Sequence, residues 1–267
     1  MRVLVTAPRS ELGRVVVRAR GDDRGRGAPV VINIALQEPN TLLHDGRAWW
    51  REPAAHIIAS TRRVLAAAGR DRAAFLVHAS YAFLQGAESG ASAGPRMAPI
   101  IEAAREAERL VLDSATPACV VRLGYLYGPE WRDLRAYRTA FRLGRPYWAG
   151  PRRNLQHHLF GDDAARALVT AAQRRSSGRV TYATDGTPTS FAEFMDDFAR
   201  LVGRSRPLHL PGASRLLVRA VVRETHMEMV EMAATGPATP QLPGWRPRIP
   251  DHGAGLAEVV AAWEHTR

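Results

Sequence analysis

Short apolar runs alternate with stretches of helical apolar spacing along the first half of the chain. Four runs have the length and β-branched content of buried strands, at residues 1–5 (MRVLV), 30–36 (VVINIAL), 74–79 (AFLVHA) and 118–123 (ACVVRL). Residues 51–68 and 97–112 carry apolar side chains at helical spacing. Strands that alternate with helices predict a parallel, doubly wound α/β sheet.

The opening stretch, MRVLVTAPRSELG, reads as a strand followed by a turn that starts a helix. A dinucleotide-binding fold keeps its glycine-rich phosphate loop at this place. Of the three glycines expected there, only Gly13 remains, and Ala7 and Ser10 stand at the other two positions. A Ser10 side chain would occupy the space of the pyrophosphate, and Pro8 removes one backbone N–H donor. The loop therefore reads as degenerate.

Composition excludes several function classes. The net charge of +11 comes entirely from dispersed arginines, because the chain contains no lysine, so we expect no nucleic-acid partner. Without lysine, the chain can form no Schiff base. Cys119 is the only cysteine, so no internal disulfide is possible. No apolar run reaches about 18 residues and no signal peptide is evident, so we expect a cytoplasmic protein without a membrane partner.

The order of these segments resembles the extended short-chain dehydrogenase/reductase family, in its NAD-dependent epimerase/dehydratase branch. The resemblance is carried by MRVLVTAPRSELG, VVINIAL, IIASTRRVLAAAG, FLVHASYAFLQG, REAERLVL, VVRLGYLYGP, GDDAARA and GWRPRIPDHGAGL. It implies a Rossmann-like core at 1–127, to which 155–186 return, and a smaller C-terminal substrate lobe at 128–154 and 187–267. It also implies a homodimer formed through the helices at 51–68 and 97–112.

Departures from the family pattern guide the functional prediction. The second and third strands, which hold the adenosine in the family, are missing between Arg20 and Val30. Ile100 and Ala104 stand where the family has its catalytic tyrosine and lysine, and Tyr81 stands at its serine or threonine position. On these grounds we expect no cofactor, and the Ser-Tyr-Lys catalytic set is lost.

By the same resemblance, the ligand cleft lies at the carboxyl ends of the strands. The acid/base candidates are Tyr81, Tyr125 and His157. The candidates for substrate binding are Tyr127, Trp131, Tyr147, Arg152 and Met229. The pair His157-His158 ahead of Asp162-Asp163 could suggest a metal, but adjacent histidines diverge on a strand, so we expect no metal site.

The leading expectation is therefore a protein without NAD(P) that acts on a small aromatic or polyketide-like molecule, in secondary metabolism. Cyclisation, isomerisation, dehydration or lyase chemistry could run on its tyrosines and histidine. The alternative is a non-catalytic pseudoenzyme that senses a ligand or scaffolds a partner. A working NAD(P)-dependent epimerase or reductase is disfavoured at this point.

Overall fold

A five-stranded parallel sheet forms the centre of the protein in the computed structural model, which describes residues 1–21, 25, 27–34, 53–204, 208–210, 224–232 and 238–265. The strands lie in the order β1-β2-β3-β4-β8. Their bounds are Val3–Val5 for β1, Val30–Asn33 for β2, Phe75–Tyr81 for β3, Ala118–Leu123 for β4 and Val180–Ala183 for β8. All four pairings are parallel, so every strand ends at the same edge of the sheet.

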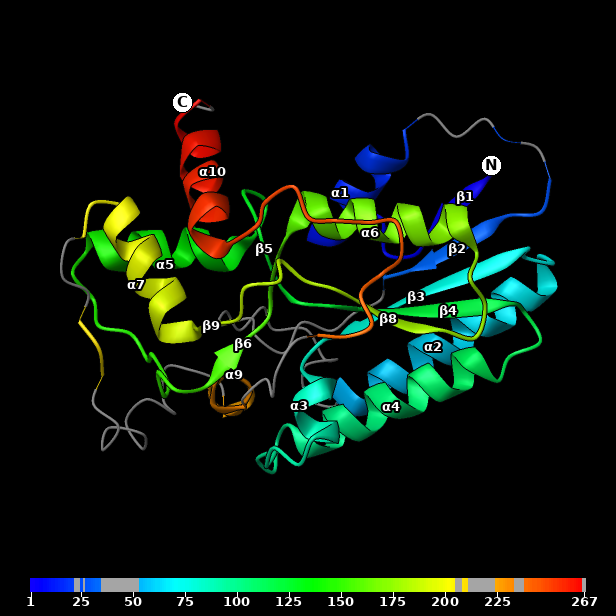
Figure 1. Ribbon diagram of the computed structural model, residues 1–267, viewed down its shortest axis with the longest axis horizontal. Helices are drawn as coiled ribbons and strands as arrows, with labels where there is room; N and C mark the ends of the chain where they lie inside the picture. The colour runs from blue at the N-terminus through cyan, green and yellow to red at the C-terminus, as the bar shows by residue number, and fades with distance from the viewer. Residues whose placement is uncertain are drawn as a thin grey trace.

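Helices cover both faces of this sheet (Figure 1). On one face lie α1 (Glu11–Arg20) and α6 (Gly161–Arg174), and on the other lie α2 (Pro53–Arg70) and α4 (Ala98–Leu112). The apolar residues of the strands alternate between the two cores, as a sheet buried on both sides requires. The predicted doubly wound α/β fold is confirmed.

The sheet is truncated on the side of its first strand. Only residues 21–29 separate α1 from β2, and β2 pairs directly with β1, with Val3 opposite Val30. Nine residues cannot hold two strands and a helix, because one βαβ unit needs about 30. Within the part of the chain that the structure describes, β1 is the edge strand of this sheet.

The remaining described elements lie beside the sheet and form the other half of the molecule (Figure 1). Its strands pair as β5 with β7 and β6 with β9, and its helices pack around an aromatic core. Their bounds are Tyr125–Tyr127 for β5, Arg132–Arg142 for α5, Leu155–Gln156 for β6, His158–Phe160 for β7, Thr189–Ser190 for β9, Phe191–Leu201 for α7, Glu224–Glu231 for α9 and His252–Glu264 for α10. The division into a core at 1–127 with 155–186 and a lobe at 128–154 and 187–267 stays a prediction.

Several elements were not anticipated from the sequence. Among them, the segment after β3 contains the short helix α3 (Leu84–Glu88), and β8 completes the sheet. The run Val180 to Ala183 carries the signal of a strand, since it is flanked by polar residues and rich in β-branched and aromatic side chains. None of the helices in the described ranges is long and apolar enough to cross a membrane.

Candidate functional site

Two features of the loop between β1 and α1 are typical of a phosphate loop. Ala7 has a φ of 45°, in the left-handed region that favours glycine. A Cβ atom on Gly13 would lie 2.2 Å from the carbonyl oxygen of Ala7, so only glycine lets α1 pack this closely against the loop. Ala7 therefore adopts a backbone conformation that is usual for glycine.

Ser10 points back onto α1. Its hydroxyl donates a hydrogen bond to the carbonyl oxygen of Ala7 (2.9 Å) and accepts one from the N–H of Gly13 (3.0 Å), as an N-cap residue does. Both hydrogen bonds hold the Ser10 side chain at the start of the helix. The expectation that it takes the space of a pyrophosphate stays a prediction. The outer side of the loop, at residues 7–10, is exposed.

A chain of buried hydrogen bonds joins the ends of the first three strands. The hydroxyl of Thr6 donates to Oδ1 of Asn33 (2.9 Å), and Nδ2 of Asn33 donates to Nδ1 of His78 (2.9 Å). Burial lowers the pKa of His78 to about 4, which keeps the ring neutral and able to accept. The sequence analysis missed Asn33 and His78, although a polar residue inside an apolar strand run is the signal that could have found them.

Tyr125 and His157 lie together at the carboxyl edge of the sheet. The N–H of Tyr125 donates to the carbonyl oxygen of His157 (2.7 Å), and Nε2 of His157 lies 3.1 Å from Oε1 of Gln85 in α3. Tyr81 ends β3 opposite Leu123 of β4, and its ring stacks on Phe83 with 4.8 Å between centroids. The three acid/base candidates thus come from adjoining segments of the carboxyl edge.

The five predicted substrate contacts divide into three groups. Tyr127 and Trp131 are core residues, with exposed fractions of 0% and 3%, and burial raises the pKa of Tyr127 far above its usual value. Tyr147 and Arg152 meet at one carboxylate, since both donate hydrogen bonds to Asp196.

Met229, the fifth candidate, is buried in α9, and its carbonyl oxygen accepts a hydrogen bond from Gln156 (3.0 Å). Because Tyr127 and Trp131 expose almost no surface, a ligand could reach them only after rearrangement of the core. The substrate-binding role of all five residues stays a prediction.

The helix that carries the catalytic pair in the family is apolar at both positions. Ile100 and Ala104 of α4 are each 2% exposed and belong to the core. Ala104 borders a cavity of about 10 Å³ that is also lined by His78 and Tyr81. Neither residue can give or take a proton, and the chain has no lysine to replace the missing one.

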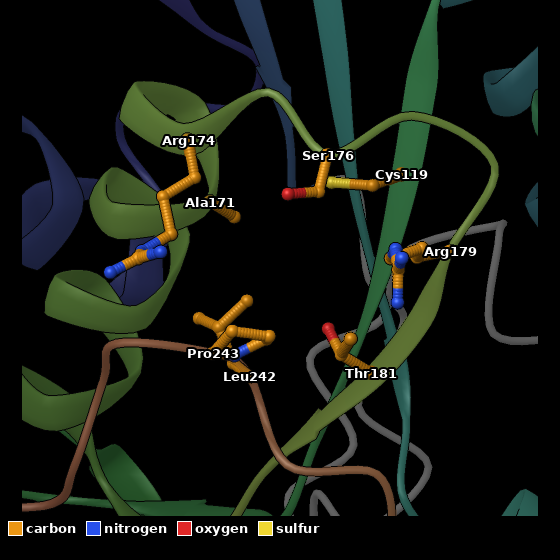
Figure 2. Close-up of a pocket in the computed structure, with 8 residues that line it drawn as sticks. All are labelled: Cys119, Ala171, Arg174, Ser176, Arg179, Thr181, Leu242 and Pro243. Atoms are coloured by element: carbon orange, nitrogen blue, oxygen red, sulfur yellow. The ribbon is translucent and has the colours of Figure 1, made fainter.

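Cys119 lies beside a second small cavity, on the α6 side of β4 (Figure 2). Figure 2 shows Cys119 and Thr181 on neighbouring strands, with Ala171 and Arg174 of α6 across the cavity. Burial raises the pKa of the Cys119 thiol to about 12, so the nucleophilic thiolate is not formed near neutral pH. The cavity of about 10 Å³ holds at most one water molecule. Cys119 is a core residue.

Among the described residues, no group of three or more histidine, cysteine, aspartate or glutamate side chains is arranged to hold a metal ion. Of the two aspartates that follow the histidine pair, Asp163 has a structural role. Asp163 accepts hydrogen bonds from the N–H groups of Arg248 and Ile249, both at 2.9 Å, and so fixes the segment before α10.

Comparisons with known proteins add three findings. No family model matches the chain. It is 31% identical over 166 residues to a 3-diazoavenalumate denitrifying reductase of a Streptomyces species, a match that spans 61% of this chain and 53% of that protein. The chain thus corresponds to about half the length of this relative.

Two solved structures have the same fold over nearly all of both chains. One is the human epimerase family protein SDR39U1 with NADPH, at 19% identity and a TM-score of 0.73, with 98% of this chain and 99% of that one covered. The other is RMD from Pseudomonas aeruginosa with NADPH, at 17% identity and a TM-score of 0.66, with 99% and 100% covered.

These findings overturn the expected function. We expected a protein that acts without NAD(P), as a cyclase, isomerase or lyase, or alternatively a pseudoenzyme. This expectation is contradicted, because the relative is a reductase and the two solved structures contain NADPH. The expectation rested in part on Ala7 and Ser10 as obstacles to the cofactor. In the structure the φ of Ala7 lies in the left-handed region that favours glycine, and Ser10 caps α1.

Three observations agree with the predicted resemblance. They are the order of the strands, the helices on both faces of the sheet, and the match of fold over 98% of the chain. The resemblance to the extended short-chain dehydrogenase/reductase family is confirmed, and the chain has the fold of that family's epimerase/dehydratase branch.

Proposed function

We propose that the protein is an NAD(P)H-dependent reductase whose substrate takes up a hydride and needs no proton from the enzyme. One contrast carries this proposal. The loop at residues 6–10 keeps features typical of a phosphate loop, whereas α4 is apolar and buried at Ile100 and Ala104. The part of the fold that holds a hydride donor is kept, and the part that donates a proton is not.

The residues of the loop fit the diphosphate of a dinucleotide. Residues 7–10 are exposed, the Ser10 hydroxyl is turned back, and the N-terminus of α1 directs a partial positive charge toward the loop. Residues 6–10 and the first turn of α1 would hold the diphosphate. A bound nicotinamide cofactor would supply the hydride.

The need for a proton separates classes of substrate. Reduction of a carbonyl adds a hydride to carbon and a proton to oxygen, so such enzymes require a general acid. A diazonium group, R–N₂⁺, takes a hydride at its terminal nitrogen to give R–N=NH. Loss of N₂ then leaves that hydrogen on carbon, so that R–N₂⁺ and H⁻ give R–H and N₂. Charge and atoms balance without an added proton.

A diazo substrate therefore agrees with the apolar α4 helix. The denitrifying reductase that shares 31% identity with this chain, and whose substrate is named as a diazo compound, supports the same class. We propose that Tyr81, Tyr125 and His157 contact the substrate. Aromatic ring faces attract a cation, and the hydrogen bond to Gln85 fixes the His157 ring. Arg152 and Tyr147 of the lobe remain candidates for its acidic or polar end.

The decisive experiment follows the hydrogen atom. The protein is incubated with an aromatic diazo acid and NADPH deuterated at the transferred position, and separately with unlabelled NADPH in D₂O. We expect one N₂ released for each NADPH oxidised in both reactions, with deuterium from the cofactor on the product carbon wherever N₂ leaves before the N–H of R–N=NH exchanges with solvent. Oxidation of NADPH without release of N₂, or no N₂ although NADPH binds, would contradict the proposal.

Variants test the roles of the side chains in the same assay. Tyr81→Phe and His157→Ala should act mainly on KM, with kcat changed less than about tenfold, since no proton has to be delivered. If Tyr81→Phe instead slowed turnover by roughly a thousandfold, as expected when a general acid is removed, Tyr81 would be identified as a proton donor.

We further propose a cytoplasmic homodimer, in which the outer faces of α2 and α4 form the contact. The two helices pack side by side on one face of the sheet, so that together they offer one continuous surface (Figure 1). Light scattering of the purified chain measures this directly, and a monomeric mass at micromolar concentration would refute it.

A further inference from the structure

An open groove runs along the edge of the sheet, between β1 and α2. It has a volume of about 290 Å³. The strands contribute Leu4, Val5, Thr6 and Val31, and α2 contributes Ser60, Arg63, Val64, Ala67, Ala68 and Asp71. The walls are mostly apolar, and the charged residues are Arg63 and Asp71. Whole pockets for drug-sized ligands measure roughly 300 to 1,000 Å³, so this groove suits part of a larger molecule.

The groove begins where the phosphate loop begins. Thr6 lines it and is also the residue that follows β1, directly before the exposed loop at residues 7–10. Beyond β1 the described part of the sheet has no further strand that would close the groove on this side. A ligand whose diphosphate lies on the loop could extend into the groove with no gap between the two.

The positive charge in the groove comes from Arg63 of α2, and Asp71, directly after the helix, adds a negative charge. Arg63 is exposed at the groove. The pKa of His56, two turns earlier on the helix, is lowered first by the burial of its own ring and then by the positive charge of Arg63. The neighbouring Arg62 is also exposed but points to α4, where it adds to the effect of Arg109 in lowering the pKa of Glu106. Two adjacent arginines therefore serve different surfaces.

We propose that this groove holds the adenosine half of NADPH, with Arg63 bound to its 2′-phosphate. The inference rests on the proposed reductase function and assigns the cofactor's adenosine to a groove that adjoins the phosphate loop. An adenine ring is flat and largely apolar at its faces, which matches walls made by Val31, Val64 and Ala67. The guanidinium group of Arg63 matches a phosphate in charge and in hydrogen-bonding geometry.

A contact between Arg63 and the 2′-phosphate would make the protein selective for NADPH over NADH. The two cofactors differ only in the 2′-phosphate, so Arg63 interacts with one of them alone. A hydrogen-bonded charge pair of this kind corresponds to roughly a ten- to hundredfold difference in affinity.

Binding, and not turnover, gives the test. Calorimetry measures the dissociation constants of NADPH, NADH and 2′,5′-ADP for the wild type, Arg63→Ala and Arg62→Ala. We expect Arg63→Ala to weaken NADPH and 2′,5′-ADP about ten- to hundredfold and to leave NADH unchanged. Arg62→Ala removes the same charge from the same helix and should change none of the three.

The outcomes separate the two proposals. If the wild type binds NADPH and Arg63→Ala binds it equally well, the groove is not the site of the 2′-phosphate, and the reductase proposal is unaffected. If both arginine variants weaken NADPH alike, the effect is one of general charge, and the groove is again excluded. If the wild type binds neither NADPH nor NADH, the proposed function itself is refuted.

A second variant tests the walls of the groove independently of charge. Ala67→Phe adds a ring inside the groove, at a half-buried position of α2. We expect it to weaken NADPH, NADH and 2′,5′-ADP at least tenfold while the melting temperature stays near that of the wild type. Unchanged binding of 2′,5′-ADP in a folded Ala67→Phe protein would overturn the adenosine site even if Arg63 proved important.

Discussion

The hydroxyl of Ser10 accepts a hydrogen bond from the N–H of Gly13 at 3.0 Å, and this contact decides how the phosphate loop is understood. It satisfies one of the free N–H groups at the start of α1 and holds the side chain away from the outer side of the loop. A residue that looked like an obstruction in the sequence is a helix cap in the structure.

Replacement of Ser10 should affect stability in a graded way. Ser10→Ala removes the cap and should lower the free energy of unfolding by about 1 kcal/mol, whereas Ser10→Gly should lower it by only a few tenths. Urea denaturation of both variants measures this. NADPH affinity should not fall in Ser10→Gly, and a loss there would show that the serine contacts the cofactor.

Gly13→Ala should damage the loop directly. The added Cβ would meet the carbonyl oxygen of Ala7 at 2.2 Å, and overpacking of this kind lowers stability by roughly 1–3 kcal/mol. NADPH binding should weaken with it, because α1 must move away from the loop. Gly69→Ala, in α2, is the matched control, since its Cβ meets nothing within 4 Å. An intact NADPH site in Gly13→Ala would contradict the close packing described above.

The buried histidine of the Thr6–Asn33–His78 chain predicts acid sensitivity. The folded protein holds the pKa of His78 at about 4, below the value of about 6.5 in an unfolded chain. Between these two pH values the unfolded chain binds more protons, so the free energy of unfolding falls as the pH falls, by up to about 3 kcal/mol.

Urea denaturation between pH 7 and pH 4 measures this loss. His78→Gln should show a smaller decrease over that range. Part of the pH dependence should remain in the variant, because burial also lowers the pKa of His158, to about 3. An identical pH dependence in both proteins would show that His78 does not titrate as described.

A buried ion network at the end of β4 predicts strong coupling between its members. Arg122 donates hydrogen bonds to Glu108 (2.7 and 2.9 Å), and both side chains are 7% exposed, while Glu88 pairs with the same guanidinium. Arg122→Met leaves the carboxylate of Glu108 buried without its partner and should destabilise the protein by about 3–5 kcal/mol.

The double variant Arg122→Met/Glu108→Leu tests this coupling. It should recover most of the loss, because neither charge is then buried alone. Thermal and urea unfolding of the two single variants and the double variant form the cycle. Additive losses would show that the two residues do not act as a pair.

Several parts of the fold were predictable from local patterns. The runs that became β1, β2, β3 and β4 are continuous and apolar, because strands buried on both faces leave no polar side. The truncation was also predictable, since the distance from Arg20 to Val30 limits what can be built there. The strand β8 and the short helix α3 were not predicted, because four or five residues carry little periodic signal.

The candidate site was predicted less well. Adjacent segments of the carboxyl edge do carry Tyr81, Tyr125 and His157, as the order of strands implies. Tyr127 and Trp131 look the same in sequence, but both are core residues: Tyr127 packs against the rings of Phe160 and Phe194, and Trp131 packs against Gly161. Asn33, His78 and Gln85 gain their roles from partners far away in the chain.

Spacing was enough to establish the α/β class and the short connection before Val30, and composition established that the chain has no lysine. The resemblance to the family assigned the positions of the catalytic pair to Ile100 and Ala104. The course of the phosphate loop depends instead on tertiary packing, because the φ of Ala7 and the direction of the Ser10 hydroxyl follow from how α1 lies against the loop. Packing also separates Arg62 from Arg63, because α2 presents one side to α4 and the other to the open edge of the sheet.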